Sequence, residues 1–290
     1  MKLSPEKMAE VAEVAEDESA GNRYSAPALE KGLDILEALA TTTEGVTLNQ
    51  LAGMLGRNVN QIFRMVATLH QRGYIQTGSD DRYSLTLKIF RLAHRQPPLK
   101  LMIELAQPLL RELAERSKQS CHLAVYEQGR MVVVSQADSP ERWSLGLKVG
   151  AVMGLTDTSS GHVLLAYQDE VGRTRMLNSR VKVDGEQDMD PGHLLELLAE
   201  VRRDGGSVMP SIQIHGVTNI AQPVRGSGAR VVAAINIPYI ARIDKAPGPS
   251  IEEVRQMQAD ICRRLSIKLG FDEEAAEGSA QPDIATWLAP

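Results

Sequence analysis

Cysteine and long apolar runs are both scarce in this chain. Only Cys121 and Cys262 occur, far apart and without the paired spacing of a zinc site or a disulfide framework, so we expect ordinary core thiols and no metal or cofactor. No stretch approaches the roughly 18 apolar residues of a membrane helix. The acidic start, MKLSPEKMAEVAEVAEDESA, lacks the apolar centre of a signal peptide. The sequence therefore predicts a cytoplasmic protein that does not associate with membranes.

A strong charge of one sign is also missing. The 290 residues, 43% hydrophobic and 24% charged, suit two ordinary globular domains. A net charge of −5 argues against a protein that coats nucleic acid generally, but the charge is unevenly spread. Between residues 57 and 95, seven basic residues accompany two acidic ones, Asp80 and Asp81, a local balance of +5. The basic residues of this patch are Arg57, Arg64, Arg72, Arg82, Lys88, Arg91 and Arg95.

Three helices are predicted in the first hundred residues. The first follows the period of Leu29, Leu33, Ile35, Leu36 and Leu39 and ends in the loop TTTEG. Thr47 opens the second helix, with Gln50 completing a capping box. Gly56 breaks the chain, and a third helix ends near Gly73. The inner face of this third helix is expected to comprise Ile62, Phe63, Met65, Val66 and Leu69.

After Gly73 the apolar period changes to that of a hairpin, YIQT and YSLTL around the turn-rich GSDDR. Three helices and a two-stranded ribbon form a winged helix-turn-helix. In that motif the start of the third helix enters the major groove of DNA. Asn60, Gln61 and Arg64 share one face there, and amide and guanidinium groups can bond to adenine and guanine. Asn58 lies nearest the expected helix cap, so its amide can bond the helix start instead.

Arg57 and Arg82 are the other predicted DNA contacts. Arg82 lies at the wing, where a cation reaches phosphate or the minor groove; alternatively it pairs with Asp80 or Asp81. The whole polar face also has an alternative, as the solvated side of a protein-binding module. The basic excess at the helix and wing favours DNA.

The rest of the chain is predicted to mix helices and strands. Residues 84 to 95 return to helical spacing and stop before Gln96-Pro97-Pro98, and a leucine period then continues to Ser117, with Pro108 kinking that helix or restarting it. HLAVYEQGRMVVVSQAD and NIAQPVRGSGARVVAAINI are typical of hairpins. Helical stretches fall at 160 to 168 and 192 to 204, and Ser250 with Glu253 caps a last helix. These elements predict an α+β domain, a sheet covered by helices.

Several of these segments together resemble the IclR family of bacterial transcription regulators. They are ALEKGLDILEAL, TLNQLAGMLGRNVNQIFRMVATLHQRGYI, RYSLTLKIFRLA, GLTDTSSGHVLLA and GVTNIAQPVRGSGARVVAAINI, which cover nearly the whole chain from Ala28 to Phe271. The resemblance implies a dimerising winged helix-turn-helix, a connecting helix and a GAF-like domain that binds a small metabolite. It implies operator binding as a homodimer or homotetramer, and it places Arg64 at the family's recognition-helix arginine.

The resemblance and the residue patterns together predict five segments. They are an acidic N-terminal extension (1–24), a winged helix-turn-helix (25–84), a linker helix (85–98), a GAF-like effector-binding domain (99–272) and a disordered tail (273–290).

Two departures from the family pattern affect the expected ligand site. Gly154-Leu155-Thr156 and Gly161-His162 stand where relatives usually carry Pro-Leu-His and Gly-Lys. Asn219 replaces a frequent cysteine, and Asn236-Ile237-Pro238 replaces Ser-x-Ser. The identity of the ligand therefore does not transfer from the family.

The effector site is predicted at the start of an apolar helix, where Thr158, Ser159 and Ser160 offer hydroxyls and unpaired backbone N–H groups to an anion. A plain helix cap predicts the same residues. Asn219 and Asn236 are expected to face one side of the sheet, where a polar ligand, the backbone or ordered water would bond them. Apolar neighbours are expected from Met153, Leu155, Met209 and Ile220, and His215 is either a ligand contact or a loop residue.

Patterns of enzymes and metalloproteins are missing. No HExxH motif or close His pair anchors a metal, and Asp157-Thr158-Ser159-Ser160-Gly161 departs from the nucleophile elbow G-x-S-x-G. The resemblance implies effectors such as organic acids, aromatic compounds or sugar derivatives. With it, the sequence predicts a regulator, expected to be a repressor, that binds double-stranded operator DNA and changes affinity when it binds such a small molecule. The alternatives are a winged-helix protein-binding module and a small-molecule enzyme without sequence-specific DNA binding.

Overall fold

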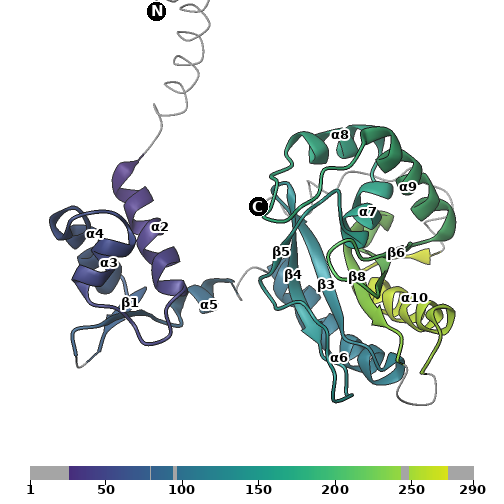
Figure 1. Ribbon diagram of the computed structural model, residues 1–290, viewed down its shortest axis with the longest axis horizontal. Helices are drawn as coiled ribbons and strands as arrows, with labels where there is room; N and C mark the ends of the chain where they lie inside the picture. The colour runs from purple at the N-terminus through teal and green to yellow at the C-terminus, as the bar shows by residue number, and fades with distance from the viewer. Residues whose placement is uncertain (1–25, 79, 94–96, 243–247, 274–290) are drawn as a thin grey trace, which may run out of the picture. The chain divides into compact units, whose positions relative to one another are not determined.

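The computed structural model describes residues 26–78, 80–93, 97–242 and 248–273 (Figure 1). The chain divides into two compact units, the first ending at Gln96 and the second beginning at Pro97. The predicted acidic extension, and the predicted tail apart from Glu273, lie outside the described residues. Each unit has a hydrophobic core of its own.

The N-terminal unit is a winged helix-turn-helix, as the sequence predicts. Its elements are α2 (Pro27–Ala40), α3 (Leu48–Met54), α4 (Val59–Gln71), β1 (Ile75–Thr77), β2 (Tyr83–Leu85) and α5 (Lys88–Ala93). Strands β1 and β2 pair antiparallel as the wing. Ile35, Leu51 and Ile62, one from each of the first three helices, are fully buried at the centre of this unit.

Capping boxes fix where α3 and α4 begin. Thr47 and Gln50 form the predicted box at α3, and Asn58 and Gln61 form a second one at α4. Each box satisfies backbone N–H groups that a helix start leaves without partners. Gly56, with φ of +60°, makes the turn between the two helices in the left-handed region that glycine adopts without strain.

Two local predictions in this unit are wrong. Phe63, expected on the inner face of α4, is 55% exposed, because Ile62 and Val66 already fill the contact with α2 and α3. The connecting helix, expected from residue 84, begins only at Lys88. Leu85 instead pairs with Ile75 in the wing and packs against the core, so tertiary pairing overrides the helical spacing.

In the described part of the C-terminal unit, six antiparallel strands form one sheet in the order β5-β4-β3-β8-β7-β6. The strands are β3 (Cys121–Glu127), β4 (Arg130–Ala137), β5 (Val152–Met153), β6 (Ser207–Pro210), β7 (Val217–Arg225) and β8 (Val231–Ile240). The helices are α6 (Pro97–Ser117), α7 (Ser159–Ala166), α8 (Glu170–Asn178), α9 (Pro191–Asp204) and α10 (Ile251–Lys268), and a 3-10 turn η1 (Ser227–Ala229) joins β7 to β8.

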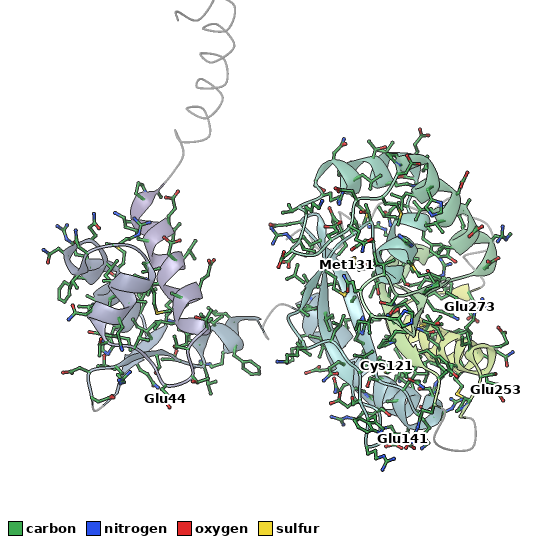
Figure 2. All side chains as sticks on the ribbon, viewed as in Figure 1. Glu44, Cys121, Met131, Glu141, Glu253 and Glu273 are labelled. Atoms are coloured by element: carbon green, nitrogen blue, oxygen red, sulfur yellow. The ribbon has the colours of Figure 1, made fainter. Side chains whose placement is uncertain are left out.

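Helices cover both faces of this sheet, which confirms the predicted α+β class (Figure 1). One core lies between the sheet and α6 and α10, the other between the sheet and α7 and α9. Cys121 and Met131, labelled in Figure 2, belong to these two cores respectively. Both cysteines are buried, and burial raises the pKa of the Cys121 thiol to about 12, as expected of core thiols. Helix α6 passes through Pro108 without a restart.

Helix α7 lies close to the sheet because small residues meet there. Ala124, Ala221 and Ala234 are fully buried in the core that α7 shares with the sheet. The small side chains of these alanines allow α7 to approach β3, β7 and β8 closely. Gly161 allows a separate close approach, to the loop before α7, since a Cβ atom at this position would lie 2.0 Å from the Leu155 carbonyl oxygen.

Candidate DNA-reading helix and effector cavity

Helix α4 separates an apolar face from a polar one. Ile62 and Val66 are buried, whereas Asn60, Gln61 and Arg64 are exposed on the side away from the core. Within the described ranges no hydrogen bond or ion pair holds the Arg64 guanidinium. The side chain is thus available to a ligand outside the chain.

Gln61 is only half available. Its Oε1 accepts from the Asn58 N–H at 3.1 Å, while Asn58 Oδ1 accepts from the Gln61 N–H at 3.0 Å. Asn58 is therefore the helix cap, as the sequence suggests, and Gln61 keeps only its Nε2 donors for other partners.

Arg57 and Arg82 both have partners inside the N-terminal unit. Arg57 forms an ion pair with Asp34 of α2 at 3.1 Å, which joins the turn before α4 to the first helix. Arg82 forms an ion pair with Asp80 at 2.8 Å and donates to the Gly45 carbonyl at 3.2 Å. The sequence left two roles open for Arg82, a contact with DNA and an ion pair with Asp80 or Asp81. The ion pair with Asp80 is present in this structure.

The predicted effector residues meet at one cavity in the C-terminal unit. It lies where the start of α7 faces β3, β6, β7 and β8. Among the lining residues are Thr158, Ser159, Ser160, Met209, Asn219 and Asn236, together with Met153. Leu155 and Ile220 are instead fully buried in the cores, and His215 is an exposed loop residue.

Side chains from four neighbouring strands lie beneath the cavity, and three of the four are polar. Met209 of β6 lies opposite Asn219 of β7, and Asn236 of β8 lies opposite His122 of β3. Asn236 Nδ2 donates to Asn219 Oδ1 at 3.3 Å, so the two amides face the same side of the sheet as predicted. This bond uses the Asn236 Nδ2 donor and leaves the Asn236 Oδ1 acceptor without a partner among the described residues.

Four buried side chains around the cavity carry polar atoms that lack a partner in the described structure. They are both ring nitrogens of His122, Asp157 Oδ1, Ser159 Oγ and Asn236 Oδ1. Each residue is at most 5% exposed. Buried polar groups are normally bonded, so a cluster of free ones at a cavity points to a missing polar occupant.

His122 and Asp157 were not predicted as site residues. Burial lowers the pKa of His122 to about 4, so its imidazole is neutral at ordinary pH. Burial also raises the pKa of Asp157, assisted by the nearby charge of Glu186. For His122 the sequence signal is a single polar residue in an otherwise apolar strand segment, which does not distinguish a cavity from a bonded core position. Asp157 lies in the loop before α7, where no periodic pattern indicates burial.

Thr158 is the helix cap of α7 and is fully used within the fold. Its Oγ1 accepts from the Gly161 N–H at 3.1 Å and donates to the Gly154 carbonyl at 2.8 Å. The cap interpretation thus holds for Thr158, whereas the Ser159 hydroxyl remains free.

A buried carboxylate braces the segment before α7. Glu186 accepts from Thr156 at 3.2 Å, from the Arg180 guanidinium at 2.9 Å and from the Val183 N–H at 3.0 Å. Asp157 Oδ2 accepts from the Gln187 N–H at 3.1 Å. The loop after α8 therefore holds the cavity wall in place.

The described part of the chain gives little support for a metal site or a membrane-spanning helix. No group of three or more His, Cys, Asp or Glu side chains is arranged there to hold a metal ion. None of its helices combines the length and apolar character needed to span a bilayer.

A winged helix-turn-helix joined to an α+β unit, whose cavity has buried polar groups at its base, defines a ligand-responsive DNA-binding regulator. The chain belongs to the IclR family of bacterial transcriptional regulators. Residues 28–79 match the IclR helix-turn-helix domain, and residues 100–263 match the bacterial transcriptional regulator IclR C-terminal domain. The family consists of transcription regulators rather than enzymes, and this protein is such a regulator.

Similar proteins agree with this assignment. The HTH-type transcriptional regulator KdgR of Escherichia coli (strain K12) is 26% identical over 246 residues, covering 84% of this chain and 92% of that protein. An IclR homologue of Microbacterium hydrocarbonoxydans complexed with 4-hydroxybenzoate has a TM-score of 0.69 at 22% identity, covering 84% of this chain and 99% of that one. The Thermotoga maritima IclR structure has a TM-score of 0.68 at 20% identity, with 84% and 98% covered.

Proposed function

We propose that the protein is a repressor that binds a pseudo-palindromic operator as a homodimer or homotetramer, and that a small metabolite in the α7 cavity changes its operator affinity. The observation that carries the effector part is the cluster of unpartnered buried polar atoms at the cavity. A regulator of operator DNA acts in the cytoplasm.

The reading face comprises Asn60, Gln61 and Arg64, all exposed at the start of α4. A helix start in the major groove presents such donors and acceptors to base edges. Arg82 contacts phosphate once DNA competes for its pairing with Asp80. We assign Arg57 mainly to holding α2 against the turn, because of its ion pair with Asp34.

Exposed apolar side chains on the N-terminal unit support self-association. Leu29 and Leu33, one turn apart on α2, are 63% and 49% exposed, and Leu87, just before α5, is 75% exposed. Large apolar side chains that lie together on an exposed helix face, as Leu29 and Leu33 do, often mark an interface. A second copy related by a two-fold axis would cover them and would present two reading helices to the two halves of a palindrome.

The effector acts by linkage. It binds one arrangement of the assembly more tightly than another, and the two arrangements differ in the spacing of the reading helices. The difference in affinity limits how far the effector can shift the equilibrium between them. The effector contacts we propose are Ser159, Ser160, Met209, Asn219 and Asn236, while Thr158, whose hydroxyl is used within the fold, holds the start of α7 at the cavity. The 4-hydroxybenzoate in the Microbacterium hydrocarbonoxydans homologue makes a small organic acid a reasonable first ligand to test here.

The decisive test is selection of bound fragments from a random DNA pool at near-physiological salt. The full-length protein and Arg64→Ala would be compared, with Gln71→Ala at the far end of the same helix as the control. We expect the wild type and the control to enrich one pseudo-palindromic site. Arg64→Ala should lose about 1–3 kcal/mol of affinity for it and relax one position. Enrichment of the same site by folded Arg64→Ala would refute the reading face.

A further inference from the structure

We infer that the effector is a small hydroxylated organic compound with at most one negative charge, and that its hydroxyl group donates a hydrogen bond to Asn236 Oδ1. This inference rests on the proposed effector role of the α7 cavity. It narrows the ligand from small metabolites in general to those that carry a hydrogen-bond donor.

The free acceptors at the cavity demand a donor. Asn236 donates its Nδ2 to Asn219 and leaves Oδ1 unpartnered in a residue that is 5% exposed. Asp157 uses Oδ2 to accept from the Gln187 N–H and leaves Oδ1 unpartnered at 3% exposure. Carboxylate and ketone oxygens cannot satisfy these atoms, whereas a hydroxyl group can.

The donors at the cavity suit the same class of compound. The Ser159 hydroxyl and the neutral His122 ring each have a donor to offer, and His122 has an acceptor as well. Ser159 also begins α7, where unpaired N–H groups favour a single negative charge. A hydroxyl group or one carboxylate can therefore accept here.

The charge of the lining sets the upper limit on ligand charge. Among the described residues that line the cavity there is no Lys or Arg, and the one carboxylate is Asp157. A ligand with two negative charges would be buried beside a carboxylate without a compensating cation, which is costly. Phosphate esters and dicarboxylates are therefore disfavoured.

Aliphatic side chains face the rest of the ligand. Leu145 and Leu147 come from the loop before β5, and Ile212 and Ile214 from the loop between β6 and β7. The two isoleucines are 39% and 47% exposed, so they have apolar surface left to cover. The site thus pairs a polar base with apolar walls, which fits a short carbon skeleton or ring that carries the hydroxyl group.

The test compares matched compounds that differ by one hydroxyl group. Isothermal titration of the full-length protein would use lactate against propionate, 3-hydroxybutyrate against butyrate, and 4-hydroxybenzoate against benzoate, with malate as the dianion. In at least one pair we expect the hydroxylated member to bind at least about tenfold more tightly, because its absence leaves a buried acceptor unpaired. Malate should bind more weakly than lactate.

Two variants test whether Asn236 causes the preference for the hydroxylated compound. Asn236→Leu removes the acceptor at nearly constant volume. It should reduce the affinity of the hydroxylated compound to that of the matched compound without the hydroxyl group. Asn178→Leu makes the same change at an exposed position of α8, outside the cavity lining, so the preference should persist. Melting temperatures of both variants check that they are folded.

The possible failures are distinguishable. Equal or tighter binding by the compounds without the hydroxyl group, or a preference that survives Asn236→Leu, would overturn the inference and leave the effector role intact. Binding by none of the compounds would overturn both the inference and the effector role, while operator selection would still decide the DNA-binding function.

Discussion

Gln61 shows how one side chain limits what α4 can read. Its Oε1 is occupied by the Asn58 N–H, so only Nε2 donors remain. The bidentate pairing of Gln with adenine needs both an acceptor and a donor. We therefore expect Gln61 to donate to a base acceptor or a phosphate, and not to form the adenine pair that its residue type suggests.

Gln61→Glu separates the capping role from the reading role. Glutamate keeps the capping acceptor, so the free energy of unfolding should change by less than about 0.5 kcal/mol. Operator affinity should fall by about 1–3 kcal/mol, because the donors are lost and a negative charge faces DNA. Fluorescence anisotropy with labelled operator measures the second quantity, and urea unfolding the first.

Gln50→Glu is the matched control for this change. Gln50 occupies the equivalent place in the capping box of α3, so the same charge is added outside the reading helix. Its effect on operator affinity should be clearly smaller. Equal losses in the two variants would show that added charge alone explains the result.

His122 makes the stability of the C-terminal unit depend on pH. Burial lowers its pKa to about 4 in the folded protein, against about 6.5 when unfolded. Between these two pKa values the imidazole is protonated in the unfolded chain and neutral in the folded one. The stability that depends on the neutral imidazole is therefore fully present above pH 6.5 and is lost as pH falls toward 4.

The pH effect can be isolated with His122→Leu. Between pH 7 and pH 5 the wild type should lose about 2 kcal/mol more of its free energy of unfolding than the variant does. His70→Ala, at an exposed position of α4, should behave like the wild type. Urea unfolding at the two pH values measures the difference. Parallel pH profiles for the wild type and His122→Leu would contradict a neutral buried imidazole.

At this scale the sequence located residues on both the helix side and the sheet side of the cavity. Ser159, Ser160 and Asn219 come from segments that carry the family resemblance, and they do line the cavity. His122 was missed because strand alternation assigns a face but does not say whether a cavity or a packed core lies against it. Asp157 was missed because it lies in a loop without a periodic pattern. The exposure of Phe63 was likewise decided by the packing of its neighbours.

At the level of single elements, α7 depends on the absence of a side chain at Gly161. A methyl group there would collide with the Leu155 carbonyl, an atom of the backbone that cannot rotate away. Gly161→Ala should therefore destabilise the C-terminal unit by about 1–3 kcal/mol, as overpacking does. It should also weaken effector binding, because it displaces Ser159.

Gly53→Ala provides the control in another helix. Gly53 lies in α3 with nothing within 4 Å of an added Cβ atom, so alanine should leave stability unchanged or raise it by up to about 1 kcal/mol. Thermal unfolding followed by circular dichroism measures both variants. A folded Gly161→Ala as stable as the wild type would show that α7 does not need this close approach.

Elements with strong local signals were predicted well. The β3–β4 hairpin has a clear turn at Gln128-Gly129, and both α3 and α10 have capping boxes. Helix α8 was missed because only Gly172 and Met176 are buried in it, which leaves no periodic stripe. Strands β5 and β6 have two and four residues, too few to show alternation.

For the whole molecule, the division at Gln96 predicts that the two functions separate. The cavity residues run from His122 to Pro238, all within the second unit. A protein of residues 97–290 should fold alone and bind the effector within about threefold of the full-length affinity, since both of its cores are complete. Calorimetric titration of both proteins tests this, and loss of binding by a folded fragment would contradict it.

The position of β8 has a consequence for how the protein is made. Among the described strands β8 comes last in the sequence, yet it joins β3 to β7 at the middle of the sheet. Until the ribosome has released residue 240, the hairpins on either side are separate and each leaves an open edge. A nascent chain is therefore most exposed to aggregation just before β8 emerges, and effector cannot protect it, because Asn236 completes the cavity.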